Sequence, residues 1–570
     1  MQSYENQNGT KAHVPSNWVP ILDKPLSTPR KLRVVCIGAG FSGLILAHKI
    51  KYDWKMDDFI ELQIYEKNDD IGGTWYENRY PGAACNDLEP LRRLCSSEFI
   101  DSYVFQFEPN PNWTSFYASS PEIWQYMKDT AVKWKLEQFI KFKARVTDSI
   151  WDDHEGKWNL KVDEDGNIVE DTCDVLVNAS GFLNKWRWPD IKGLHEFKGK
   201  LLHTANWDQS YDWAGKKVAV IGNGSSAIQV VPHLQRTAKE VVNYIRSPTW
   251  IAANFLEEYS DDGNKFYSEE KRKQFRENPE SLFELRKKLE HGFNQLFLAM
   301  LNGTPQQKAM DKQYRKIMED RLGNDSELVK HLVPSFNVGC RRLTPGDGYL
   351  EALQEKNVRC IWSPVTEVTE RGILTSEGEE EYDLIVTATG FDVSFRPSWN
   401  MVGRNGASLK TAWVDEPKAY FGMCAADHPN YFIYTGPNSP VAHGVITASL
   451  DAMTGYILKW CRKIAEEDIK SVTVKQKVVD DLSVWSQELL SKTVWAGKCR
   501  SWYKNGTVDG KITALHAGSV IHYREILQDV RGEDFEIEYR SPNEFRYLGN
   551  GLTKRDANGD DLGYYLKFEV

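Results

Sequence analysis

The sequence predicts an α/β fold with two Rossmann-like dinucleotide-binding domains and a helical insertion in the second. Two glycine-rich motifs carry this prediction, Gly38-x-Gly40-x-x-Gly43 and Gly222-x-Gly224-x-x-Ala227. Each motif follows an apolar, β-branched run that fits a buried parallel strand. Such a motif is a weak signal alone and becomes specific when a strand precedes it and a helix follows. A chain of 570 residues also exceeds the size of one core, so two or three domains are expected.

The overall composition is that of a globular protein and disfavours several partners. Hydrophobic residues make up 41% and charged residues 27% of the chain, and both fractions are ordinary. The net charge of -10 gives no reason to expect nucleic acid or an anionic membrane as a partner. Residues 1–30 form a polar arm without a signal pattern, and no apolar window is long enough to span a bilayer. We therefore expect no membrane insertion and a cytoplasmic location; the oligomeric state is not predicted.

The cysteines give a further expectation about redox chemistry. There are nine, an odd number, scattered along the chain without a C-x-x-C pair. This pattern argues against a disulfide framework and against a dithiol redox centre, and it suits a reducing compartment. No metal site is predicted.

The first unit, residues 31–150, has the features of a dinucleotide site. A strand at Leu32–Ile37 leads through the first glycine motif into a helical segment at Leu44–Ile50. The glycines permit a tight turn, close approach to a pyrophosphate and close packing of helix on strand, and the helix N-terminus favours phosphate charge. Glu66 ends the next strand, Ile60–Tyr65, where a carboxylate accepts a hydrogen bond from a ribose hydroxyl. The nucleotide-binding residues predicted here are Gly38, Gly40, Phe41, Ser42, Gly43, Glu66 and Lys67.

The second unit, residues 151–385, has different chemistry at the end of its second strand. A strand at Lys217–Ile221 precedes the second glycine motif, and the next strand, Val241–Ile245, ends in Arg246. A cation where NAD-binding folds place a carboxylate favours the 2′-phosphate of NADP, and the hydroxyl of Ser247 can add to it. Two different strand ends imply two different nucleotides. The residues predicted for the second nucleotide are Gly222, Gly224, Ser225, Ser226, Ala227, Arg246 and Ser247.

The remaining domain assignments rest on composition and periodicity. Residues from about 256 to 333 are rich in Lys, Glu, Arg, Gln and Leu at helical spacing, which predicts a helical insertion in the second unit. A strand at Leu384–Ala388 follows. We assign residues 386–570 to the second part of the first domain and a C-terminal region.

Three further motifs carry a family resemblance. Residues 197–208 fit the fingerprint F-x-G-x-x-x-H-x-x-x-W followed by Pro or Asp, through Phe197, Gly199, His203 and Trp207. Residues 72–82 read G-G-T-W-Y-x-N-R-Y-P-G, and residues 340–353 read C-R-R-L-T-P-G-x-G-Y-L-E-A-L. On these motifs the chain resembles type I Baeyer–Villiger monooxygenases, the class B flavin monooxygenases, and in particular fungal members. We expect the stretch 197–208 at the hinge between the two units, with its histidine and tryptophan facing the space between them.

The resemblance implies FAD in the first nucleotide site and NADPH in the second. It implies that residues 72–82 form the wall over the flavin ring, that Arg341 contacts the NADP phosphate, and that Ala388-Thr-Gly390 marks the return of the chain to the first domain. It adds as cofactor-binding residues Gly73, Thr74, Trp75, Asn86, Asp87 and Arg341. The residues it implies for catalysis are Arg342 as the active-site arginine, Asp87 as its partner, and His203, which couples the domains during NADPH binding without acid–base chemistry.

The implied activity is the insertion of one oxygen atom from O2 next to a carbonyl, through a C4a-peroxyflavin, so that a ketone becomes an ester or a lactone. This chemistry needs a water-poor pocket and a fixed cation for the developing negative charge. An arginine suits that role because it stays protonated and donates in a fixed fork. The implied partners are a small-molecule ketone and O2. The 20 tryptophans suit a bulky apolar substrate, and fungal relatives favour a secondary-metabolite ketone.

One loop departs from the family pattern and leaves alternatives open. Relatives place an aspartate directly after the Y-P-G-x-x-C motif, whereas here Asn86 intervenes before Asp87 and the spacing from Cys85 to Tyr103 is longer. The loop is either a native insertion or a foreign sequence that disables the site. A non-catalytic or uncoupled NADPH-oxidising paralogue is therefore one alternative. A flavin monooxygenase that oxidises nitrogen or sulfur is another, disfavoured by His203, Trp207 and Arg342. A flavin disulfide reductase is disfavoured because it needs a C-x-x-C pair.

Overall fold

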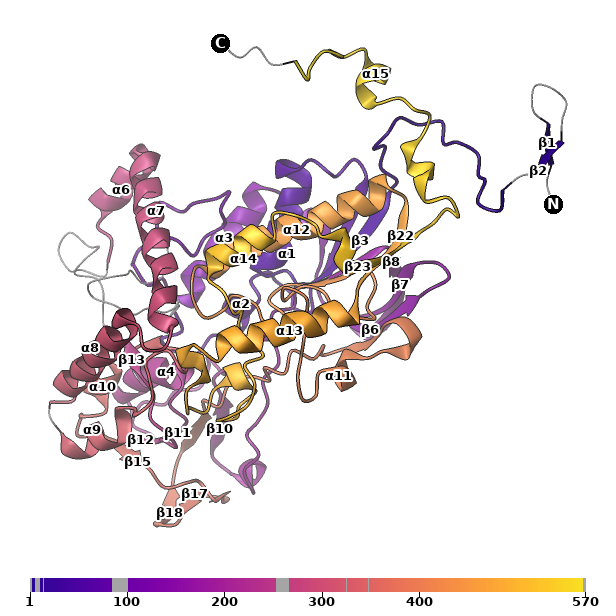
Figure 1. Ribbon diagram of the computed structural model, residues 1–570. Coiled ribbons are helices and arrows are strands. Elements are labelled where there is room, and N and C mark those ends of the chain that lie inside the picture. The colour runs from indigo at the N-terminus through magenta and orange to yellow at the C-terminus, as the bar shows by residue number, and fades with distance from the viewer. Residues whose placement is uncertain are drawn as a thin grey trace.

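The architecture consists of two parallel sheets, each carrying one glycine motif, with helices packed around them (Figure 1). The computed structural model describes residues 3–5, 11–13, 15–84, 101–252, 266–323, 325–346 and 348–566. The two sheets lie in different halves of the molecule, and the carboxyl-terminal chain runs across both halves (Figure 1).

The first sheet contains the amino-terminal glycine motif. Its five strands, in spatial order and all parallel to their neighbours, are β21 (Tyr431–Ile433), β9 (Val175–Asn178), β3 (Leu32–Ile37), β4 (Ile60–Tyr65) and β5 (Ile140–Lys141). Successive side chains of a strand point to opposite faces. Val34 and Cys36 therefore pack in the same core as α1 (Phe41–His48) and α12 (Ile446–Glu466), while Val35 and Ile37 pack on the other face.

A smaller sheet covers that other face. Its strands, in spatial order, are β20 (Asn400–Val402), β6 (Ala144–Asp152), β7 (Lys157–Glu164) and β8 (Asn167–Cys173). Trp151 and Trp158 of this layer lie in one core with Val35 of β3. Further elements of this half are α2 (Thr74–Glu77), α3 (Ser120–Lys133), α11 (Leu409–Ala412), β22 (Ile469–Val474) and β23 (Phe535–Tyr539).

The second sheet contains the other glycine motif and, like the first, is parallel and covered on both faces. Its five parallel strands, in spatial order, are β10 (Lys200–His203), β19 (Leu384–Thr387), β11 (Lys217–Ile221), β12 (Glu240–Tyr244) and β15 (Val358–Ile361). Val218 and Val220 face the core that holds α4 (Ser225–Gln235) and α10 (Tyr349–Ala352). The opposite face is covered near β16 (Glu367–Val368), β17 (Gly372–Thr375) and β18 (Gly378–Glu381).

The helical insertion lies in the chain between β13 (Ile251–Ala252) and β14 (Thr344–Pro345), which pair with each other. Its helices are α6 (Glu269–Glu277), α7 (Pro279–Gln295), the 3-10 turn η4 (Leu296–Met300), α8 (Pro305–Arg321) and α9 (Ser326–Leu332). Ser268, Asn278, Thr304 and Asp325 each accept a backbone hydrogen bond at a helix start, which satisfies orphan amide groups. The helices gather on one side of the second sheet (Figure 1).

The carboxyl-terminal region connects the two halves. Helix α13 (Gln476–Leu490) places Val479 in the core of the first sheet and Leu490 in the core of the second. Helix α14 (Val520–Ile526) lies against α12. The hairpin of β1 (Ser3–Glu5) and β2 (Lys11–His13) and the helix α15 (Lys554–Asn558) extend away from the body (Figure 1).

The predicted fold class is confirmed. The strands predicted at both glycine motifs are present, and β12 begins and ends one residue earlier than predicted. Strand β9, inside the span 151–385 proposed for the second unit, pairs with β3, so the chain leaves the first sheet only after Asn178. Its apolar sequence does not reveal which sheet it joins. In the part of the chain that the structure describes, no helix is both long and apolar enough to cross a membrane.

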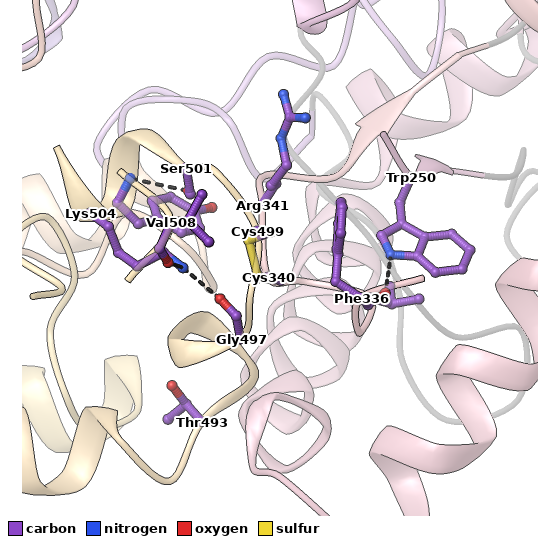
Figure 2. Close-up of a disulfide and its surroundings, with 12 residues drawn as sticks. Trp250, Phe336, Cys340, Arg341, Thr493, Gly497, Cys499, Ser501, Lys504 and Val508 are labelled. Atoms are coloured by element: carbon purple, nitrogen blue, oxygen red, sulfur yellow. Dashed lines mark hydrogen bonds between the residues drawn. A yellow bond between two sulfur atoms is a disulfide. The ribbon is translucent and has the colours of Figure 1, made fainter. Parts of the chain in front are cut away.

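One disulfide departs from the expectation drawn from the cysteine pattern. Cys340 and Cys499 are bonded across 159 residues of sequence and join the second domain to the carboxyl-terminal region (Figure 2). The sequence could not indicate this disulfide, because only the folded chain brings two cysteines that are so far apart in the sequence close together. The remaining cysteines for which the structure gives a state are free: Cys36, Cys173, Cys360, Cys424 and Cys461.

We expect the disulfide to stabilise the fold. Replacing Cys499 by serine should lower the free energy of unfolding by roughly 2–5 kcal/mol, because the unfolded chain loses a long covalent loop. Thermal unfolding with and without reductant measures this effect. Reductant should lower the midpoint of the unmodified protein and of Cys360→Ser, a variant at a free cysteine, and leave that of Cys499→Ser unchanged. A midpoint insensitive to reductant in the unmodified protein would contradict the stabilising role.

Candidate active site

One large cavity, of about 1860 Å³, connects the two glycine motifs. It lies at the carboxyl ends of the strands in both sheets, the edge at which open parallel sheets bind their ligands. Its wall includes residues from the first motif, the second motif, the loop at 339–344 and the carboxyl-terminal segment at 500–506. Two ligands that bind at separate sheets can therefore meet in one enclosed space.

The first end of the cavity is shaped by glycines that allow close backbone contact. Gly38 has a φ of +110°, and a Cβ there would lie 2.6 Å from the carbonyl oxygen of Ala179 at the end of β9. A Cβ on Gly43 would clash with the carbonyl oxygen of Gly38. The turn and the start of α1 therefore require glycine at both positions. The residues of this turn line the cavity, where backbone amides at a helix N-terminus can bind a pyrophosphate.

Glu66 lies buried beside this turn. Its carboxylate accepts hydrogen bonds from the backbone amides of Ala39, at 2.8 Å, and Asn68, at 2.9 Å. Burial raises the pKa of Glu66, and the two amide donors oppose that rise. Each carboxylate oxygen still has a second lone pair. The residue therefore fits a ribose hydroxyl at the cavity wall.

The loop at 71–84 lies between the first motif and the second domain. A Cβ on Gly73 would lie 3.4 Å from the Cα of Gly40, so this loop rests directly on the phosphate-binding turn. Further along, the hydroxyl of Tyr80 donates to Gln229 of α4 at 2.6 Å, and Gly82 packs against His233 of the same helix. The loop thus contacts both nucleotide-binding units.

The second end of the cavity repeats the first. Gly222 has a φ of +118°, and a Cβ there would lie 2.6 Å from the carbonyl oxygen of Ala388 at the end of β19. The hydroxyls of Ser225 and Thr344 are 2.6 Å apart, which fixes the start of α4 against the loop at 339–344. The side chain of Asn223 donates to the carbonyl of Ser247 at 2.8 Å.

Two arginines and a serine form a cationic cluster at the end of β12. Arg341 donates to the carbonyl of Pro248 at 3.0 Å and to the hydroxyl of Ser247 at 3.4 Å. Burial and the nearby charge of Arg246 lower the pKa of Arg341. Two guanidinium groups held close together repel each other, and a bound dianion would relieve that repulsion. The cluster therefore fits a phosphate monoester beyond the adenosine ribose.

Arg342 follows Arg341 in the same loop and is two residues from Cys340, which forms the disulfide. Burial raises the pKa of Tyr503 to about 12, and the charge of Arg342 acts against that rise, which places the two side chains close together. Cys340 is bonded to Cys499, which holds Ser501 near this loop (Figure 2). Arg500, Trp502 and Tyr503 line the same cavity as Arg342. Arg342 thus places a cation on the wall of the cavity that holds both glycine motifs.

His203 lies behind the cavity wall. Its ring stacks on Trp186, with centroids 4.8 Å apart, and its Nε2 is 3.4 Å from the hydroxyl of Thr389. Because Nδ1 accepts from the amide of Ala205, the proton of the neutral ring is on Nε2. Burial lowers the pKa of His203 to about 4, so the ring is neutral near pH 7. His203 therefore contacts both segments that connect the domains, the one after β9 at Trp186 and the one after β19 at Thr389.

The structure corrects the expected orientation of this stretch. Residues 200–203 form the edge strand β10 of the second sheet, and Trp207 is buried in the core of that sheet instead of facing the space between the domains. Gly199 has a packing role, because a Cβ there would lie 2.5 Å from the ring of Phe197. The motif thus fixes the position of His203 through local packing.

The cavity brings together most of the residues that the sequence singled out. Those on its wall are Gly38, Gly40, Phe41, Ser42, Glu66, Lys67, Gly73, Thr74, Trp75, Gly222, Gly224, Ser225, Ser226, Arg246, Ser247, Arg341 and Arg342. Gly43, Ala227 and His203 lie outside that lining. Asn86 and Asp87, with the unusual loop after Cys85, lie outside the described residues.

Some wall residues were missed by the sequence analysis. They include Arg145, Thr147, Asn223, Thr344, His443, Arg500, Trp502 and Tyr503. The proximity of Asn223 and Thr344 to recognised motifs was a usable signal. The carboxyl-terminal residues gave none, because only the fold and the disulfide bring them to the cavity.

Comparisons with known proteins agree with this geometry. Residues 31–324 match the model of a family described as "Flavin-binding monooxygenase-like". The "FAD-binding monooxygenase tazF" of Aspergillus terreus is 45% identical over 98% of this chain and 98% of its own. A "Baeyer-Villiger monooxygenase" of Pseudomonas aeruginosa is 31% identical over 89% of this chain and 92% of its own.

Solved structures share the fold of this chain. An oxidized steroid monooxygenase bound to NADP superposes with a TM-score of 0.73 at 25% identity, covering 90% of this chain and all of that one. The shared fold, the extent of the family match and the identity to full-length relatives together show that the chain belongs to the flavin-binding monooxygenase-like family.

Proposed function

We propose that the protein is an FAD- and NADPH-dependent monooxygenase that inserts one oxygen atom from O2 beside the carbonyl of a ketone. The observation that carries this proposal is that one cavity is lined by both glycine motifs and by Arg342. Relatives named as an FAD-binding monooxygenase and a Baeyer–Villiger monooxygenase support it. In balance, ketone, O2, NADPH and a proton give ester or lactone, water and NADP⁺.

The residues at the two ends bind different nucleotides in this proposal. The amides around Gly38 and the carboxylate of Glu66 fit the pyrophosphate and ribose of FAD. Arg246, Ser247 and Arg341 fit the 2′-phosphate of NADPH, which two guanidinium forks bind more strongly than a hydroxyl. FAD, when bound, supplies the electron transfer from NADPH to O2.

Arg342 stabilises the negative charge that develops on the substrate oxygen. It stays protonated beside Tyr503 and is held in place by the bonded loop at 340. At ~4 Å and an effective dielectric near 20, a pair of unit charges is worth on the order of 4 kcal/mol before desolvation. Asp87 is proposed as the partner that orients this arginine, and Asn86 as a further cofactor contact.

The cavity wall around Arg342 suits a bulky apolar ketone, including secondary metabolites. Phe293, Leu296, Met300, Trp495 and Trp502 line this part of the wall. Such side chains exclude water, which strengthens the effect of the fixed cation. His203 contributes by contacting the connecting segments at Trp186 and Thr389, so that its ring links nucleotide binding to domain position. The cytoplasmic location and the division at residues 30, 150 and 385 stay predictions.

Arg246 should determine the choice of nicotinamide cofactor. In Arg246→Ala, the preference for NADPH over NADH in kcat/KM should fall by roughly 10- to 100-fold, because a charge-assisted contact to the 2′-phosphate is lost. The kinetics of flavin reduction with both nucleotides measure it. Arg236→Ala, at an exposed residue past the end of α4, is the matched control and should keep the preference. Equal use of both nucleotides by the unmodified protein would contradict the assignment.

Arg342 should separate oxygen transfer from NADPH oxidation. Arg342→Ala should retain FAD and consume NADPH but form hydrogen peroxide in place of ester, with a loss of roughly 100-fold or more in ester formation. Arg342→Lys should recover little, because an ammonium lacks the planar fork. Its neighbour provides the control: Arg341→Ala should raise the KM for NADPH and keep the ratio of ester to NADPH. Near-normal coupling in Arg342→Ala would refute the role.

His203 should affect communication between the domains and not FAD binding. In His203→Ala, flavin reduction by NADPH should slow roughly 10- to 100-fold, because contacts that set the geometry of the connecting segments are lost. Stopped-flow reduction at saturating NADPH measures this rate. His195→Ala, at an exposed histidine of the same region, should leave it unchanged. If His203→Ala is reduced at the normal rate, the histidine has only a packing role.

A further inference from the structure

One histidine on the cavity wall has no role in the chemistry described so far. His443 lies in the segment between β21 and α12, and only 7% of its surface is exposed. It lines the cavity. Within the described part of the chain, neither of its ring nitrogens has a hydrogen-bond partner. A buried polar group in this state is costly, so the observation requires an explanation.

The surroundings of His443 are aromatic. Its ring centroid lies 5.1 Å from that of Phe297 in η4 and 5.9 Å from that of Trp495, which is stacked at 29°. Trp495 itself lines the cavity. These contacts fix the plane of the imidazole, because the ring of Phe297 packs against it from η4 and the ring of Trp495 from the segment before Cys499. The histidine is therefore a rigid polar group among aromatic neighbours.

This wall belongs to the same part of the cavity as Arg342. A Cβ on Gly339 would lie 2.8 Å from the Sδ of Met300 and 3.3 Å from Val494. The loop at 339–344, which carries Arg342, therefore contacts η4 and the segment that leads to Cys499. Trp495 lies between that contact and Cys499 in the chain. Arg342, Trp495 and His443 line the same cavity, so one ligand can contact all three.

The protonation state of His443 defines what it can bind. Burial lowers the pKa of His443 to about 4, so the ring is neutral near pH 7. The nearby His516, also buried, has a pKa lowered to about 3 and is neutral as well. A neutral imidazole offers one N–H donor and one nitrogen acceptor. It therefore matches a hydroxyl group, which both donates and accepts, better than it matches a charged group.

His48 shows that a buried histidine without hydrogen-bond partners is not by itself evidence of a ligand site. Both ring nitrogens of His48 also have no partner within the described residues, but this ring stacks on Phe107 at 3.5 Å and lies outside the cavity lining. His48 is a packed core histidine. What distinguishes His443 is that its unpartnered ring borders the space in which a substrate fits.

We propose that His443 is a substrate-positioning residue that hydrogen-bonds a hydroxyl group of the substrate, so that the protein selects planar aromatic ketones that carry a ring hydroxyl. This inference rests on the proposed function, because it names the substrate class of the same site. The aromatic wall stacks on the ring system, the histidine fixes its in-plane orientation, and Arg342 is left to face the carbonyl.

Binding to the FAD-loaded, oxidised protein tests this inference without turnover. The probes are 1-tetralone and its 5-, 6- and 7-hydroxy derivatives, which are isomers of one another. Their binding is measured by the change that they cause in the flavin absorbance. The unmodified protein should bind at least one hydroxy isomer roughly tenfold more tightly than 1-tetralone. His443→Leu should lose that preference and bind 1-tetralone as before, while His443→Asn should keep part of it. His48→Leu is the matched control and should keep the preference in full.

Kinetics add a second readout. For the preferred hydroxy isomer, His443→Leu should raise KM roughly tenfold and leave kcat and the rate of flavin reduction by NADPH unchanged. An equal ratio of affinities in His443→Leu and the unmodified protein would overturn the inference, as would a loss of bound FAD or a changed KM for NADPH. If the unmodified protein forms no ester from any ketone but the preference depends on His443, the proposed function fails and the hydroxyl contact stands.

Discussion

The close approach of two glycines to two carbonyl oxygens is the constraint on which the rest of this structure depends. Gly38 lies against Ala179, and Gly222 lies against Ala388, with the same spacing. Each alanine ends a strand that neighbours the glycine-bearing strand, and each is followed by the chain segment that passes to the other domain. The places where nucleotides bind are therefore also the places where the chain crosses between domains.

The two segments that connect the domains, one after β9 and one after β19, are paired with each other. Trp186 and Phe391, one from each connecting segment, form a β-bridge, and the amide of Asp392 donates to the carbonyl of Lys185 at 2.7 Å. His203 touches both segments through Trp186 and Thr389. A change at either nucleotide thus reaches a paired backbone element, and the histidine lies where the two segments meet.

The sequence predicted what local pattern determines and missed what only long-range folding determines. Strand ends such as Glu66 and Arg246 were predictable, because a glycine motif fixes which strand follows and where it stops. His443, Tyr503 and the bond between Cys340 and Cys499 were not, since each depends on segments far apart in the chain meeting at the cavity. Trp207 was assigned to the wrong environment because its motif defines spacing and says nothing about direction. Strand β9 could not be assigned to a sheet, since its apolar residues suit either one.

The path of the carboxyl-terminal chain has a mechanical consequence. Helix α13 begins in the core of the first sheet and ends in the core of the second, and the disulfide then fastens the following segment to the arginine loop. Residues 494–506 are thereby held to the second domain, although the helix before them begins in the core of the first. A rotation of one domain against the other would therefore move Trp495 and Tyr503 with the second domain, and the aromatic part of the cavity wall would change its distance from the first glycine motif.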